Sequence, residues 1–223
     1  MLHYIPIPEL VATAHRSKGA EQMLTVTQAG PADLPAVARV LASAFTEDPV
    51  MGPLISGRRR DARFRALFEA LLRSGSRAGV RIDTARDEHG KVVGAATWEP
   101  PGSRLTFLTQ LPELPAYLRA VGMRGFFAGM WLELTLSRFR PRAPHWYLAE
   151  LGVSPERRGT GVGSALLRSR LATIDAEQYA AYLESSSPRN RSLYRRFGFT
   201  ATVRIARVPH ADPVGMWRPA RHR

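Results

Sequence analysis

The sequence predicts one mixed α/β domain, with helices on both sides of a central sheet of about seven strands. Strand-like and helix-like segments alternate along the 223 residues, the pattern that produces such layered folds. Hydrophobic residues make up 44% of the chain and charged residues 23%, which is ordinary for a globular domain with a full core. A glycine-rich turn between a strand and a helix, at residues 159–163, is the sequence feature most typical of a ligand site.

Apolar periodicity and turn residues place the elements in order. We expect strands at residues 24–28, 80–85, 92–98, 146–153, 180–184, 200–208 and 214–217. We expect helices over 34–45, over 64–72 with an end near Ser74-Gly75, from the glycine-rich turn to about Ala176, and over 190–197. Residues 103–144 read as an inserted section of short helices, punctuated by prolines and glycines.

The first 22 residues differ from the rest of the chain. They mix Pro6, Pro8, Lys18 and Gly19 without clear periodicity, and they lack the apolar core of a secretory signal. We expect residues 1–22 to form an N-terminal extension that could be disordered, and residues 23–223 to form the domain. Met23 stands just before the first strand and could be the natural start of translation.

The composition excludes several kinds of reactive or metal site and indicates the cellular compartment. The absence of cysteine excludes disulfides, thiolate metal sites and cysteine nucleophiles, and it fits a cytoplasmic protein. No apolar run approaches the ~20 residues of a membrane span, so no membrane partner is expected. The six histidines show no ligand spacing, so no metal is expected.

The net charge of +13 comes almost entirely from arginine, since all but two of the 32 basic residues are arginines. Arginine binds phosphate groups well, which suits an anionic ligand. The arginines recur along the whole chain instead of forming one stripe with interleaved aromatic residues. A nucleic-acid partner is therefore not favoured.

The glycine-rich turn has the pattern Arg-x-x-Gly-x-Gly, formed by Arg158, Gly161 and Gly163. Glycines let a backbone approach a ligand closely, and the helix that follows offers free amides and a positive dipole end. These features suit a pyrophosphate. A Walker loop is excluded because this turn contains no lysine. The dinucleotide fingerprint is excluded because the glycines follow the spacing Gly-x-Gly-x-Gly instead of Gly-x-Gly-x-x-Gly.

A second motif, at residues 190–199, follows the strand that ends at Glu184. Asn190 and Tyr194 are four residues apart and share one face of the predicted helix, while Leu193 and Phe197 share another. We expect the Leu193 face to pack in the core and the Tyr194 face to point at a ligand. Taken singly, a tyrosine such as Tyr194 is more often a core aromatic than a catalyst, and an asparagine such as Asn190 is more often a helix cap.

The two motifs in this order resemble those of the GNAT acetyltransferase superfamily. The resemblance implies a GNAT fold, acetyl-CoA as co-substrate, and an inserted helical section before the strand that binds it. It also implies that the strand and turn hold the pantetheine arm and the pyrophosphate, together with Asn190. The residues assigned to this binding are Leu151, Gly152, Val153, Arg158, Gly159, Thr160, Gly161, Val162, Gly163, Ser164 and Asn190.

The same resemblance implies direct transfer of an acetyl group to an amine, with Tyr194 protonating the departing thiolate. Glu184 and Glu150, on neighbouring strands, are the two candidates for the general base. Residues 145–155 and 182–190 are similar to the puromycin N-acetyltransferase branch, which implies a primary amine of a small molecule, conceivably an aminonucleoside, as acceptor.

Two alternatives stay open from the sequence. The first is a protein or peptide N-acetyltransferase. The second is a non-catalytic module of the same fold that binds acetyl-CoA or nucleic acid, suggested by the net charge of +13. The sequence is compatible with either a monomer or a homodimer.

Overall fold

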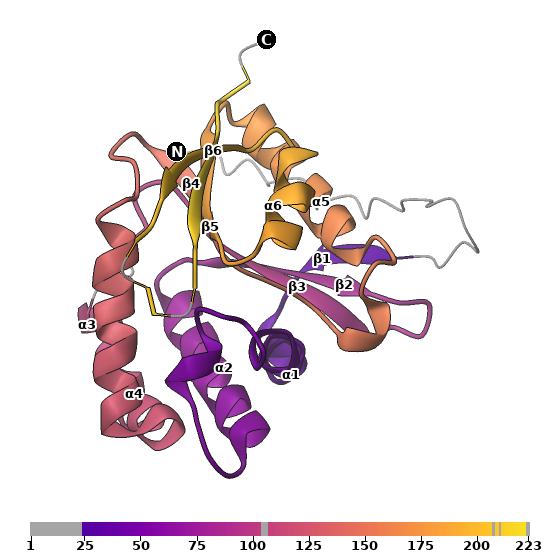
Figure 1. Ribbon diagram of the computed structural model, residues 1–223. Helices are drawn as coiled ribbons and strands as arrows, with labels where there is room; N and C mark the ends of the chain where they lie inside the picture. The colour runs from indigo at the N-terminus through magenta and orange to yellow at the C-terminus, as the bar shows by residue number, and fades with distance from the viewer. Residues whose placement is uncertain (1–23, 104–106, 207, 210, 222–223) are drawn as a thin grey trace, which may run out of the picture.

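The computed structural model describes residues 24–103, 107–206, 208–209 and 211–221 (Figure 1). Its centre is a seven-stranded sheet with the order β1-β2-β3-β4-β5-β7-β6. β4 and β5 pair in parallel, and the other described pairs are antiparallel. The expected mixed α/β fold is confirmed. The expectations for residues 1–22 and for Met23 lie outside the described residues.

The strands and helices follow the predicted order. The strands are β1 (Thr25–Gln28), β2 (Arg81–Arg86), β3 (Val92–Glu99), β4 (His145–Val153), β5 (Ala180–Ser185), β6 (Thr200–Arg204) and β7 (Val214–Arg218). The helices are α1 (Leu34–Phe45), α2 (Arg60–Arg77), α3 (Phe107–Gln110), α4 (Leu114–Ser137), α5 (Val162–Ala176) and α6 (Pro188–Arg195).

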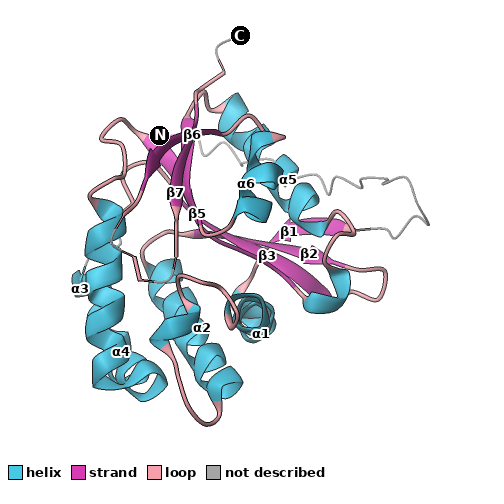
Figure 2. Cartoon of the chain, viewed as in Figure 1, coloured by secondary structure: helices cyan, strands magenta, loops and turns pink. Residues whose placement is uncertain are grey.

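The helices form two layers around the sheet (Figure 2). α5 and α6 cover one face, where Trp98, Leu148 and Leu166 belong to one buried apolar cluster. α1 and α2 cover the other face, where Leu41, Phe64 and Phe68 belong to a second cluster. α4 packs beside α2, so it extends this second layer outward from the sheet.

The inserted section agrees with the expectation of short helices separated at prolines and glycines. α3 and a 3-10 turn, Leu111–Glu113, precede α4. α4 itself consists of two helical segments that meet at a kink at Gly122, whose φ is 70° and ψ 175°. A glycine adopts these angles without the steric cost that a side chain would bring.

Three boundaries differ from the prediction. The strand expected over 200–208 ends at Arg204. α2 continues through Ser74-Gly75 to Arg77, and Gly75 packs closely against Val80: a Cβ there would lie 3.3 Å from Val80 Cγ2. α6 ends at Arg195, ahead of Phe197. No helix in the described ranges combines the length and apolar character that crossing a membrane requires.

Candidate active site

The sheet opens between β4 and β5. These parallel strands pair over a short stretch that ends with Leu148 opposite Leu183. β4 continues to Val153, still paired with β3, but no described strand lies along its other edge beyond Leu148. Residues 149–153 therefore present an edge of backbone amides and carbonyls with which an extended amide ligand could pair. The predicted pantetheine-binding residues, Leu151 to Val153, lie on this edge.

The glycine-rich turn follows β4 and leads into α5. Gly159 and Gly161 have φ values of 83° and 91°, in the left-handed region that favours glycine. A side chain at Gly159 would meet nothing within 4 Å, so the turn is open on that side. α5 begins at Val162 without a side-chain cap. The first amides of the helix and its positive dipole end are thus available to an anion, as a pyrophosphate requires.

The two arginines before the turn differ in their surroundings. Arg157 forms an ion pair with Asp87, at 3.2 Å, and so ties the start of the turn to the β2–β3 hairpin. Arg158 is exposed and takes part in none of the ion pairs found in the described part of the chain. Arg158 is therefore the better placed of the two to meet a phosphate group.

The second motif lies on α6. Ser187 caps this helix, since its Oγ accepts a hydrogen bond from the Asn190 amide at 3.3 Å. Asn190 is thus not the helix cap, and its half-buried side chain is left for another role. Tyr194 is buried in the apolar cluster under α5 and meets the Phe199 ring edge-on, at 6.0 Å between centroids.

The expected division of α6 into two faces is only partly present, because Tyr194 packs in the same cluster as Leu193 and Phe197. Burial raises the pKa of Tyr194 far above its usual value, and the Asp48 carboxylate raises it further. The phenol therefore keeps its proton at neutral pH, as a proton donor must.

Glu184 lies near the end of β5 in a network of polar side chains. It accepts hydrogen bonds from the Tyr147 hydroxyl at 2.6 Å and from Arg140 Nε at 3.4 Å. The Arg140 guanidinium also stacks over the Tyr147 ring, 3.9 Å from its centroid, and pairs with Glu133 at 3.0 Å. Burial raises the pKa of Glu184, an effect that Arg140 and Tyr147 oppose. The network links the splayed strands to the end of α4.

Glu150 lies on the same face of the sheet as Glu184. Its side chain accepts a hydrogen bond from the Thr97 hydroxyl, and its amide donates one to Thr97 Oγ1 at 3.1 Å. Burial raises the pKa of Glu150, although the bond from Thr97 opposes the rise. Glu150 lines a cavity of about 50 Å³ between α2 and the sheet, together with Leu71 and Glu99.

Glu99, the last residue of β3, is the carboxylate that the sequence did not reveal. Burial raises its pKa to about 7; Arg140 opposes this rise, and Glu150, Glu133 and Glu184 add to it. Glu99 is opposite Tyr147 in the β3–β4 register. The structure therefore places Glu150 and Glu184 on one face of the sheet and adds Glu99 to them.

The sequence also did not indicate Arg140, which lies beyond the end of α4 in the insertion. The only available signal for Glu99 was its position next to the predicted strand 92–98, just before Pro100-Pro101. No local spacing relates either residue to Glu184. Their convergence depends on strand register and on the path of the insertion.

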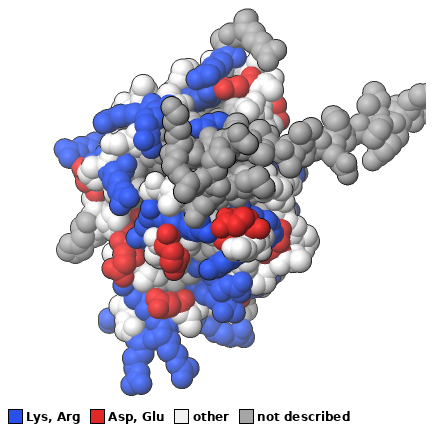
Figure 3. Space-filling view, turned by 90° about the vertical axis from the view of Figure 1, so that its right-hand side faces the viewer, with Lys and Arg blue, Asp and Glu red and all other residues white. Residues whose placement is uncertain are grey.

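Surface charge is mixed on the face drawn in Figure 3, where arginines and lysines are interspersed with acidic residues. Within the described residues, no group of three or more histidine, aspartate or glutamate side chains could hold a metal ion.

The splayed sheet, the glycine-rich helix start and the facing carboxylates define the class of α/β acyltransferases. Comparison with known proteins identifies the family within that class. The Acetyltransferase (GNAT) domain family matches residues 124–201. A solved structure described as histone acetyltransferase HPA2 and related acetyltransferase, from Corynebacterium glutamicum, is 33% identical, covers 90% of this chain and 98% of its own, and superposes with a TM-score of 0.71. The chain belongs to the GNAT acetyltransferase family and is an acyltransferase.

Two further relatives agree with this assignment. An uncharacterized N-acetyltransferase of Schizosaccharomyces pombe is 28% identical over 180 residues, covering 75% of this chain and 70% of its own length. A GNAT phosphinothricin acetyltransferase from Sinorhizobium meliloti, solved in complex with AcCoA, is 19% identical over 88% of both chains, with a TM-score of 0.56. The latter likeness concerns the fold alone.

Proposed function

We propose that this chain transfers the acetyl group of acetyl-CoA to the primary amine of a small molecule. The observation that carries the proposal is the opening between β4 and β5, with an uncapped, glycine-rich helix start on one side and three carboxylates on the other. The first feature suits an anionic donor that carries amides. The second suits a cationic amine.

The donor side of the site is assigned to backbone groups. Residues 149–153 would pair with the pantetheine amides, as a strand pairs at a sheet edge. The amides from Gly159 to Ser164 would hold the pyrophosphate, and Arg158 would add positive charge. Asn190 would bind the pantetheine arm. Bound acetyl-CoA supplies an acetyl group activated as a thioester.

The proton transfers are assigned to side chains. As the C–N bond forms and the C–S bond breaks, Tyr194 would donate its proton to the leaving sulfur, and a carboxylate would accept the proton of the amine through water. Glu150 or Glu184 would serve as that base. Glu184 already accepts two hydrogen bonds from neighbours, whereas Glu150 accepts one, which favours Glu150.

The acceptor is proposed from the resemblance of residues 145–155 and 182–190 to puromycin N-acetyltransferases. Puromycin and other aminonucleosides therefore come first in a screen of amines, with release of free thiol as the readout. A second candidate is a protein amine, favoured by the 33% identity to a structure whose name includes histone acetyltransferase. Mass shifts of +42 Da on added protein substrates, with no turnover of small amines, would favour that candidate.

The donor site is tested by calorimetry of acetyl-CoA against Thr160→Glu, with Thr160→Gln as the matched neutral control. Thr160 is exposed in the turn, and both variants lose the same hydroxyl bond to the Arg157 carbonyl. Substitution at Gly159 or Gly161 is less suitable because both have positive φ, which strains any other residue. A carboxylate beside a pyrophosphate costs about 1–3 kcal/mol, so Thr160→Glu should bind at least about fivefold more weakly than Thr160→Gln.

Equal affinity of the two variants would contradict the assignment of the pyrophosphate to this turn. Absence of wild-type binding would contradict the proposed donor. In that case the non-catalytic module would become the better interpretation, and a steeply salt-dependent affinity for nucleic acid would support it.

A further inference from the structure

The second half of α4, after the kink at Gly122, exposes a stripe of large apolar side chains. Between 38% and 59% of each residue is accessible to solvent. The stripe consists of Met123, Phe127, Met130, Trp131 and Leu134. An exposed helix face normally carries polar residues, and a helix that is apolar all round is normally buried. The stripe is therefore a surface that would be stabilised by a partner.

The other faces of this helix already have partners within the chain. A Cβ at Gly125 would overlap the Leu54 carbonyl, so the helix backbone packs closely there. Leu132 belongs to a buried cluster with Ile205 and Val208, from the segment after β6. The stripe is the remaining face, and no described segment covers it.

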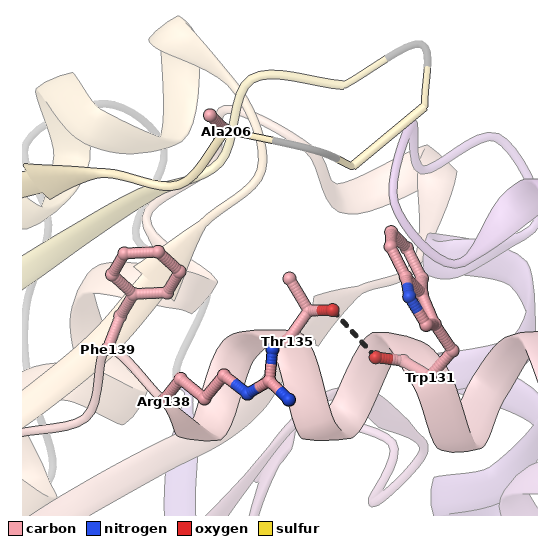
Figure 4. A pocket seen from close by; sticks show the side chains of 5 residues that line it. All are labelled: Trp131, Thr135, Arg138, Phe139 and Ala206. Carbon is pink, nitrogen blue, oxygen red and sulfur yellow. Dashed lines mark hydrogen bonds between the residues drawn. The ribbon is translucent and has the colours of Figure 1, made fainter.

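A hollow of about 370 Å³ adjoins the stripe at Trp131 (Figure 4). It lies between α4 and the segment after β6, and its walls are mostly apolar. Its lining residues are Trp131, Thr135, Arg138, Phe139 and Ala206. The Thr135 hydroxyl donates to the Trp131 carbonyl at 2.8 Å, so this polar group is satisfied within the helix. An apolar side chain that enters the hollow beside Thr135 therefore leaves this donor paired.

Four of the five stripe residues lie symmetrically about the midpoint between Met130 and Trp131, because Phe127 and Leu134 are equally far from it. The counterpart of Met123 is Arg138, which lies outside the stripe and lines the hollow. A closed dimer with twofold symmetry needs such a self-complementary patch. If a second copy lies antiparallel along α4, Phe127 meets the partner's Leu134, and Met130 meets the partner's Trp131. The partner's Met123 then lies at Arg138, beside the hollow.

We propose that a second copy of this chain covers the stripe, with the two α4 helices antiparallel across a twofold axis between Met130 and Trp131. The available area supports this occupant. A large apolar side chain offers ~200 Å², so the stripe exposes roughly 500 Å² per copy. Two copies would bury about 1,000 Å², the size at which specific interfaces begin. The stripe contains no charged residue, so a nucleic acid or an acidic peptide is a poorer match.

The oligomeric state tests the proposal without reference to catalysis. Light scattering on the full chain should give twice the 24.7 kDa of one copy at micromolar concentration. Phe127→Glu should shift the mass to that of one copy, whereas Tyr179→Glu, at an exposed aromatic between α5 and β5, should not. A single-copy mass for the wild type over the whole concentration range would overturn the proposal. So would a Phe127→Glu variant that keeps the wild-type mass.

The absence of cysteine allows the orientation to be tested by cross-linking of single introduced cysteines. Packed helices lie 8–10 Å apart, so a thiol reagent of ~10 Å reach should join two copies of Met130→Cys, at the axis. Two copies of Met123→Cys would be about 22 Å apart along antiparallel helices and should stay separate. A mixture of Met123→Cys with Arg138→Cys should again be joined. Cross-linking of Met123→Cys to itself would mean parallel helices and would overturn the proposed arrangement.

Discussion

Replacing Glu99 by glutamine tests the electrostatics of the carboxylate face without using any substrate. Burial raises the pKa of Glu99 from 4.5 to about 7; the charge of Arg140 opposes this rise, and the charges of Glu150, Glu133 and Glu184 add to it. Glutamine has nearly the shape of the protonated carboxyl group and cannot ionise. The variant therefore removes the cost of charging this position in the folded state.

The size of the effect follows from proton linkage. Between pH 4.5 and 7 the folded chain holds a proton on Glu99 that the unfolded chain has lost, so the free energy of unfolding falls as pH rises. Each tenfold difference in proton affinity is worth about 1.4 kcal/mol, which gives a total of about 3 kcal/mol. Solvent reaches part of the side chain, so this is an upper value.

The assay is urea unfolding of wild type and Glu99→Gln at pH 5 and pH 8. At pH 5 the two should be nearly equally stable. At pH 8 the variant should be more stable by up to about 3 kcal/mol, or roughly 6–12 °C in Tm for a chain of this size. If the difference between the two proteins were the same at both pH values, Glu99 would not be a buried, repelled carboxylate and the reasoning would be refuted.

The remaining predictions concern the acid, the core and the helix that carries the turn. Tyr194→Phe should slow acetyl transfer by about 10²–10⁴ and leave acetyl-CoA affinity unchanged in calorimetry; unchanged turnover would exclude Tyr194 as the acid. Asp83→Asn should lower the free energy of unfolding by about 3 kcal/mol in urea, because it leaves the buried Arg170 without its carboxylate partner. Gly94→Ala should cost about 1–3 kcal/mol by the same assay and weaken acetyl-CoA binding, because the new methyl would overlap Val162 at the start of α5. Wild-type stability of either core variant would contradict the packing described here.

The fold could be predicted because its signals are local. Short, mostly apolar runs bounded by turn residues marked β3 and β4, and the glycines at 159, 161 and 163 marked the start of α5. The insertion was harder, because a mid-chain glycine predicts a helix end as readily as a kink. Gly122 forms a kink between the two segments of α4. Tyr117, before it, packs in the cluster that includes α2 residues, and Leu132, after it, packs with Ile205 and Val208.

The candidate site was predictable only where one short motif contains it. The turn after β4 and the pair Asn190 and Tyr194 each lie within a few residues of one another. Arg140 and Glu99 are brought to Glu184 by long-range packing and strand register, which no local pattern encodes. A catalytic role of Tyr194 stays a prediction, which the turnover of Tyr194→Phe tests.

The irregular pairing of β3 with β4 has a consequence for how this site tolerates change. Thr97 pairs with Glu150 and Trp98 with Leu148, so Ala149 is an extra residue of β4 that has no partner on β3. Because of this extra residue, the side chains that face α5 change from even-numbered to odd-numbered positions along β4. Before it the even-numbered Leu148 enters the cluster under α5, and after it the odd-numbered Leu151 does.

The bulge thus lets Tyr147 and Glu150 share a face although they lie three residues apart. If the bulge closed and Ala149 joined the regular alternation, the Glu150 carboxylate would turn into the apolar layer under α5. At this strand, a change of pairing register would be more damaging than most substitutions. The spacing of the strand is as much a part of the site as its side chains.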